Sequence, residues 1–363
     1  MSASTTNVTA PLHEQVLPDL PLSSRQHLRF PCSLTAIALF VLFHLIVFGF
    51  ALAVPTLDDP NCFGILKTKH QILESTPSPK IVLIGGSNLL FGVDGPAMEQ
   101  RLHRPVVNMG LCLMFTLPYL FEEIKGSLHR GDIVVLSPEY SILSSQYENT
   151  LVMADILDGY PRAIEWMLTS NCCSVDQKWK YVLRLREEGF DKINYTFKHL
   201  SKIFTGRCVW TDGKFHLPMI MINDKNLDKC GDLTWHLHQQ HDANVDKVND
   251  LLVCNDVGDV AASEMNKFAD FCNARGVQFV LIPPPVPHVM YEKFETKINQ
   301  LMEQCKNKVR VPILGSPARY VFPDKMIFDH HYHLNKLGRP IRTERLIEDL
   351  QPCVSQSDTA LRQ

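Results

Sequence analysis

The chain has 363 residues, of which 45% are hydrophobic and 21% are charged, and this is the composition of an ordinary globular protein. Its formal net charge of −3 excludes a global electrostatic attraction to nucleic acid. The sequence contains no repeat at the spacing of solenoids or propellers, so we expect one large domain or two modest ones.

Residues 33–54 form an apolar run without a formal charge, SLTAIALFVLFHLIVFGFALAV. As a helix this run would be about 33 Å long, which is enough to cross a hydrocarbon core of about 30 Å. Arg25 and Arg29 precede the run and acidic residues follow it at 58–59. The positive-inside tendency therefore predicts a single-pass protein with a cytoplasmic N-terminus and a periplasmic or extracellular main domain. The small residues at 51–53 leave a cleaved signal peptide as an alternative, although such runs are usually about 7 to 15 residues long.

The apolar run also sets the predicted domain boundaries. Changes in composition and the positions of prolines divide the chain into five segments. These are a flexible cytoplasmic tail (1–30), a transmembrane helix (31–56), a linker (57–79), one α/β domain (80–352) and a C-terminal tail (353–363).

Short apolar runs rich in β-branched residues alternate with helical patterns through the predicted domain. The runs typical of buried strands are 80–85, 106–109, 132–136, 277–282 and 311–314. The helical patterns are 96–102, 118–128, 260–274, 291–305 and 334–350. Strands that alternate with helices predict a doubly wound parallel sheet with helices on both faces.

An insertion at 141–254 interrupts this alternation and contains all four tryptophans of the chain. Helical patterns within it are 160–168 and 177–188. We interpret the insertion as a mostly helical cap or substrate-facing lobe, because recognition is often built on such excursions. The alternative is a helical lobe that only covers the sheet.

Eleven cysteines are scattered along the chain without a CxxC pair. If the main domain is exported, disulfides can form, and the candidate pairs are Cys208 with Cys230, and Cys172 or Cys173 with a distant partner. The alternative is that most of the cysteines are small buried hydrophobic residues.

Polar residues follow the predicted strands at the edge where an open parallel sheet binds its ligands. The first strand leads into Gly86-Ser87-Asn88, and the last leads into the segment from Asp329 to His333. The glycines before Ser87 permit a tight turn, and a serine hydroxyl needs a histidine base to become a nucleophile. We therefore expect Ser87 to be the nucleophile, His333 the base and Asp329 the group that orients the base.

With these residues the chain resembles the SGNH (GDSL-like) hydrolase superfamily, in its membrane-tethered envelope acyltransferase and esterase branch. Gly86-Ser87 is similar to the first block of the family, and Asp329 and His333 are similar to its last block. Gly110, in Val-Asn-Met-Gly-Leu, is similar to the second block, whose backbone N–H contributes to the oxyanion hole. The resemblance implies a flavodoxin-like sheet of order 2-1-3-4-5 and no cofactor.

Three departures from the family pattern affect the expected chemistry. Gly86 stands where an acidic residue usually precedes the serine, and three residues rather than two separate Asp329 from His333. The Gly-x-Asn-Asp block is absent, and Ser137-Pro138-Glu139-Tyr140 stands in its place. An oxyanion donor is therefore missing, and we take Asn88 and Tyr140 as candidate substitutes; losing one such donor costs about 10² to 10³ in turnover.

Two histidine clusters raise the alternative of a metal-dependent hydrolase. One is His330, His331 and His333 beside Asp329, and the other lies at 235–241. Neither matches the HExxH or Cys/His spacing of zinc sites, so we expect no metal.

The sequence therefore predicts a membrane-anchored serine hydrolase or O-acyltransferase. Its expected substrates are acyl esters and an envelope or secreted glycan, and its expected partners are proteins of an envelope-polymer assembly. The alternative is a non-catalytic scaffold or binding subunit that keeps the same fold, which the missing third block favours.

Overall fold

The computed structural model describes residues 31–53, 65–111, 117–144, 156–157, 160, 162–165, 174–204, 210–211, 214–215, 224–239 and 253–362. The chain divides into two compact units, Met1–Leu45 and Ile46–Gln363. The α/β fold belongs to the second unit, and the first contains the beginning of helix α1 (Pro31–Ala53).

A four-stranded parallel sheet lies at the centre of the second unit. Its strands are β1 (Ile81–Gly85), β2 (Val106–Asn108), β3 (Ile133–Ser137) and β6 (Gln278–Leu281), in the order β2-β1-β3-β6. Every strand residue is buried except Gln278, which is partly exposed. The prediction of an α/β fold with a parallel sheet is confirmed, and the continuous apolar runs follow from burial on both faces.

The predicted fifth strand at 311–314 is not a strand. It makes one parallel bridge beside β6, between Leu281 and Ile313. Leu281 donates its N–H to the Pro312 carbonyl (2.9 Å), and Leu314 donates to the Leu281 carbonyl (2.8 Å). Pro312 has no N–H of its own, so the hydrogen-bond ladder cannot continue through it.

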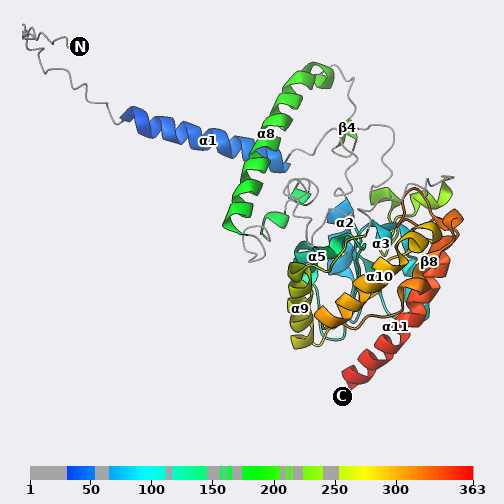
Figure 1. The fold of residues 1–363 in the computed structure, drawn as a ribbon. Helices are drawn as coiled ribbons and strands as arrows, with labels where there is room; N and C mark the ends of the chain where they lie inside the picture. Colours follow the sequence, from blue (N-terminus) through cyan, green and yellow to red (C-terminus); the bar gives the residue numbers. More distant parts are fainter. Residues whose placement is uncertain are drawn as a thin grey trace, which may run out of the picture. The chain divides into compact units, whose positions relative to one another are not determined.

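Helices cover both faces of the sheet (Figure 1). On one face, α4 (Gly95–Leu102) and α11 (Gly338–Arg362) pack against Ile81 and Leu83 of β1. On the other face, helices pack against Val82 and Ile84 of the same strand. These helices are α2 (Leu66–Ser75), α5 (Leu117–Lys125), α9 (Asp259–Ala274) and α10 (His288–Lys308). Alternate residues of one strand thus enter two separate cores, as the pleat of a strand requires.

Three helical segments differ from the sequence predictions. Helix α2 lies within the predicted linker, and its buried face includes Lys69 and His70, which obscured the apolar pattern. Helix α3 (Ser87–Gly92) follows β1 directly and was not predicted. Helix α11 continues to Arg362, so the stretch predicted as a C-terminal tail is largely helical.

The described part of the insertion is dominated by α8 (Val175–Phe204), which is much longer than the helix predicted at 177–188. Of the helix predicted at 160–168, residues 161 and 166–168 lie outside the described residues. The structure also contains two short pairs of strands: β4 (Trp210–Thr211) with β5 (Lys214–Phe215), and β7 (Val286–Pro287) with β8 (Val321–Phe322).

Helix α1 contains the apolar run of the sequence. Its stretch Leu34–Ala53 is 20 residues long, and its length and composition suit a membrane span. Large apolar side chains such as Leu34 and Phe40 are exposed along it.

The predicted disulfide between Cys208 and Cys230 is wrong, because Cys230 is a free, buried thiol. Burial raises the pKa of this thiol well above its ordinary value. Cys172, Cys173 and Cys208 lie outside the described residues.

Candidate functional site

Ser87 occupies the sharp turn between β1 and α3. Gly85 ends the strand with φ of 153°, a conformation that favours glycine, and a side chain there would collide with the Ser137 carbonyl. Helix α3 begins at Ser87 itself. The hydroxyl therefore stands at the carboxyl end of a central strand, where parallel sheets bind ligands.

Asp329 and His333 come from a loop just before α11. The backbone closes this loop, because Phe328 donates its N–H to the His333 carbonyl (2.8 Å) and His333 donates to the His330 carbonyl (2.9 Å). An antiparallel bridge joins Ile327 to Leu334 at the base of the loop. The four-residue spacing therefore brings both side chains to the same side of one turn.

The structure brings the three predicted catalytic side chains together. Nε2 of His333 is 2.7 Å from Oγ of Ser87, and Nδ1 of His333 is 2.6 Å from Oδ1 of Asp329. Both distances are within hydrogen-bond range, and the serine and histidine are 246 positions apart in the chain. The hydroxyl, imidazole and carboxylate form one continuous hydrogen-bonded chain.

Phe91 fixes the plane of the His333 ring. The two rings stack with centroids 4.1 Å apart and an interplanar angle of 6°. Phe91 lies four residues after Ser87, so both project from the same side of α3. Phe91 was not predicted from the sequence, and its spacing of four residues from the serine was the signal that could have identified it.

Two further imidazoles lie near His333. His236 is fully buried beside Phe91, with ring centroids 4.9 Å apart, and burial together with the charge of Arg339 lowers its pKa to about 4. The ring centroid of His330 is 5.3 Å from that of His333, and burial and the neighbouring histidines lower the pKa of His330 to about 4. Both groups are therefore neutral at pH 7.

The arrangement of these histidines offers no metal centre in the described part of the chain. No group of three or more His, Cys, Asp or Glu side chains there is placed to hold an ion. His241, the last histidine of the cluster at 235–241, lies outside the described residues.

The Gly110 N–H, an expected oxyanion donor, has a partner within the chain. This group donates to Oδ1 of Asn108 (2.8 Å) and so already has an acceptor. Asn108 in turn donates through Nδ2 to Asp232 (2.6 Å) and to the Leu89 carbonyl (2.9 Å). A side chain at Gly110 would collide with Leu89, so the glycine is needed for close packing against α3.

The side chain of Asn88, another expected donor, also has partners within the chain. It is fully buried, its Nδ2 donates to the Ser137 carbonyl (2.8 Å), and its Oδ1 accepts from Nη2 of Arg342 (2.7 Å). Tyr140 is also fully buried and packs into the hydrophobic core, where burial raises the pKa of its phenol. The backbone N–H of Ser87 is the remaining candidate, because amides in the first turn of a helix have no intrahelical acceptor.

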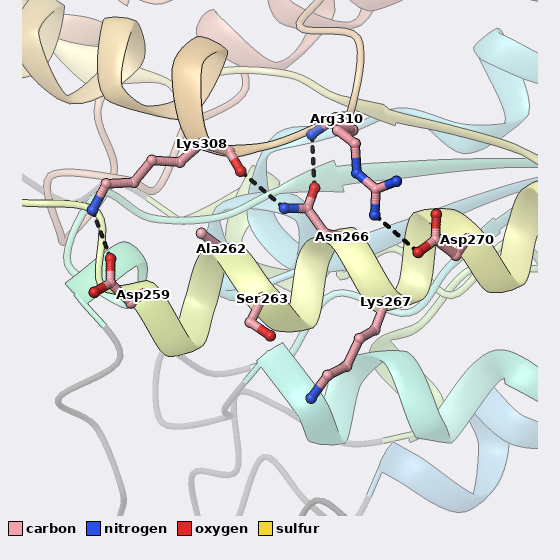
Figure 2. Close-up of a pocket in the computed structure, with 8 residues that line it drawn as sticks. All are labelled: Asp259, Ala262, Ser263, Asn266, Lys267, Asp270, Lys308 and Arg310. Carbon is pink, nitrogen blue, oxygen red and sulfur yellow. Dashed lines mark hydrogen bonds and ion pairs between the residues drawn. The ribbon is translucent and has the colours of Figure 1, made fainter.

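The depression in Figure 2 does not involve the predicted site residues. It lies along α9 and the end of α10, and its charged groups pair with one another: Lys308 with Asp259 (2.9 Å) and Arg310 with Asp270 (2.9 Å). Asn266 donates to the Lys308 carbonyl and accepts from the Arg310 N–H. These contacts tie the segment after α10 to α9, so the depression has a structural explanation.

Comparisons with known proteins do not show a family for this chain. The chain matches no protein family and no curated protein. The geometry of the site is therefore the basis for a proposed function.

Proposed function

We propose that the protein is a membrane-anchored serine esterase or O-acyltransferase that acts on acyl esters of an envelope or secreted glycan. The single observation that carries the proposal is the hydrogen-bonded chain from Ser87 through His333 to Asp329. An isolated serine hydroxyl is inert at neutral pH, and this arrangement supplies both a base and a group that orients the base.

In the first half-reaction, Oγ of Ser87 attacks the ester carbonyl while Nε2 of His333 accepts its proton. Asp329 accepts a hydrogen bond from Nδ1 and stabilises the imidazolium. The tetrahedral intermediate then collapses, the ester C–O bond breaks, and the leaving alkoxide takes the proton from His333. The products are an alcohol and an acyl group on Ser87.

In the second half-reaction, His333 removes a proton from water or from a sugar hydroxyl. The resulting nucleophile attacks the acyl carbonyl, and the proton returns to Oγ of Ser87 as the acyl–serine bond breaks. Hydrolysis and transfer differ only in this second nucleophile.

The proposal includes membership of the SGNH superfamily with a flavodoxin-like order 2-1-3-4-5. The parallel bridge of Ile313 to Leu281 supports this order, because it lies beside β6, the strand with which a fifth strand would pair. The sharp β1–α3 turn at the serine and the Asp-His loop before α11 support the family assignment.

The proposed location follows from α1. We propose that residues 33–54 cross the membrane once, with the N-terminus in the cytoplasm and the α/β domain outside. The apolar length of α1 supports the span, and the arginines before it with the aspartates after it support the orientation.

The second candidate function is a non-catalytic scaffold or binding subunit of an envelope-polymer assembly. The specific observation in its favour is that the Gly110 N–H and the Asn88 amide, two expected oxyanion donors, have other acceptors. Without such donors an acyl-transfer site loses about 10² to 10³ in turnover for each one.

Release of acetate from O-acetylated oligosaccharides distinguishes the two functions. The full chain in detergent is compared with Ser87→Ala and with Ser263→Ala, an exposed serine on α9 that serves as the control. Release that persists in the control and is lost in Ser87→Ala supports the enzyme. Glycan binding that is equal in all three proteins, without release, contradicts it and supports the scaffold.

A further inference from the structure

A buried carboxylate occupies the place of the side chain that Gly86 lacks. A Cβ built on Gly86 would overlap the carboxylate of Glu139, and the nearest atom would be Oε2. The backbone at Gly86 has φ −86° and ψ −160°, which residues other than glycine also adopt, so backbone geometry does not require glycine here. The carboxylate therefore accounts for the glycine.

Glu139 reaches this position from the neighbouring strand. It lies two residues beyond Ser137, the residue of β3 that pairs with Gly85 of β1. The side chain is fully buried, and its Oε1 accepts the backbone N–H of Asn88 (3.0 Å). This N–H lies in the first turn of α3, where backbone amides have no acceptor within the helix and a negative charge is favoured.

Arg342 also binds Asn88, through the carbonyl and the side chain of that residue. It comes from α11 and is fully buried. Its Nη1 donates to the Asn88 carbonyl (2.5 Å), and its Nη2 donates to Oδ1 of Asn88 (2.7 Å) and to Oγ of Ser137 (3.1 Å). Asn88 is thus bound by a carboxylate at its N–H and by a guanidinium at its carbonyl and side chain.

Neighbouring groups oppose the effect of burial on Glu139 and on Arg342. Burial raises the pKa of Glu139, whereas hydrogen bonds from Asn88 and the charge of His333 lower it. Burial lowers the pKa of Arg342 to about 10, and the nearby Glu139 opposes that shift. Burying an unpartnered charge is costly, so these neighbours stabilise both side chains beside the serine turn.

We propose that Glu139 and Arg342 are positioning residues that clamp Asn88 and thereby hold Oγ of Ser87 at the Nε2 atom of His333. The role in positioning rests on the proposed acyl-transfer function, whereas the clamp itself is a property of the fold. Asn88 adjoins the serine, so any shift of its backbone moves the nucleophile. Displacements of about 1 Å in such sites cost about 10²-fold in rate.

Moving the carboxylate along the chain tests the clamp. Glu139→Ala removes the acceptor of the Asn88 N–H, and Gly86→Asp forces a side chain into an occupied space, so each single variant lowers the thermal midpoint. Each also slows labelling by a fluorophosphonate by about 10²-fold. In the double variant the new aspartate carboxylate fills the vacated space, so the midpoint and the labelling rate recover towards those of the native chain.

The double variant decides the outcome. Recovery of both readouts above the level of either single variant supports the clamp, and additive losses overturn it. Recovery of the midpoint without the labelling rate overturns the positioning role. If the native chain is not labelled at all, the proposed function fails instead, and the thermal midpoints of the four proteins still test the clamp. Ser263→Ala serves as the control and leaves both readouts unchanged.

Discussion

The site and the exposed face of the long helix α8 use polar residues in different ways. Around Ser87, buried polar groups such as Asn88 and Arg342 bind partners that are 49 to 254 positions away in the chain. On α8, ion pairs such as Lys180 with Asp176 (2.7 Å) join exposed neighbours of one helix, and apolar side chains such as Trp179 are also exposed. Long-range buried contacts fix a geometry, whereas exposed local pairs contribute little to stability.

This comparison predicts that substitutions at the site change activity strongly and that substitutions on the exposed face of α8 change little. The largest expected effect is that of His333→Ala, because no base then activates Ser87. Removal of a triad histidine costs up to about 10⁶-fold in turnover. His330→Ala is the matched control, because it removes a nearby imidazole of the same loop. Equal losses of acyl release in the two variants would show that Ser87 does not depend on His333.

The next effect is that of Asp329→Asn. The amide cannot stabilise the imidazolium and favours the wrong tautomer of His333, which costs about 10⁴-fold in turnover. The measurement is kcat for acyl release at pH 7, with the thermal midpoint as the check on folding. A folded variant with native kcat would mean that Asp329 has no part in the reaction.

A smaller effect is expected for Phe91→Leu, which removes the ring stacked on His333. An aromatic pair of this kind contributes about 0.5 to 1.5 kcal/mol, so kcat should fall by about 10-fold or less. Phe121→Leu, another buried aromatic substitution, is the control and should lower the thermal midpoint without changing kcat. If the two variants have the same kcat, the stacking does not orient the base.

The pH dependence of stability tests the environment of His236. Its folded-state pKa of about 4 lies below the ordinary value of 6.5, so the unfolded chain binds more protons between these pH values. Stability is therefore present above pH 6.5 and is lost as the pH falls towards 4. The contribution of His236 between pH 7 and pH 5 is about 2 kcal/mol. Denaturant unfolding of His236→Phe should show a smaller loss over this range, and an equal loss would contradict the neutral buried state.

The smallest effect is expected for Trp179→Ala on α8. Its side chain is 64% exposed, so the free energy of unfolding should change by about 0.5 kcal/mol or less. Chemical denaturation of the full chain in detergent measures this change. A loss of several kcal/mol would mean that the contrast between the site and α8 is wrong.

Local sequence patterns were enough to predict the sheet and the three residues of the hydrogen-bonded chain. The strands β1, β3 and β6 are buried on both faces and therefore appear as continuous apolar runs. Ser87 follows the first of these runs, and His333 precedes the last helix. The carboxyl edge of a parallel sheet brings these two positions together.

The features that the sequence did not predict depend on contacts between distant residues. The direction of the Asn88 side chain is set by Arg342, which is 254 positions away, and the Gly110 N–H is taken by Asn108, whose own partner Asp232 belongs to the insertion. Helix α2 was missed because its buried positions include Lys69, which donates to the Gly231 carbonyl (2.8 Å). No local pattern contains this information.

The site of reaction with a fluorophosphonate tests the central claim most directly. The full chain is treated with the reagent, and peptide mass spectrometry locates the adduct. The account predicts one adduct per chain, on Ser87, that forms in the native protein and in His330→Ala but not in His333→Ala. A folded native chain without an adduct, or with an adduct on another serine, would contradict it.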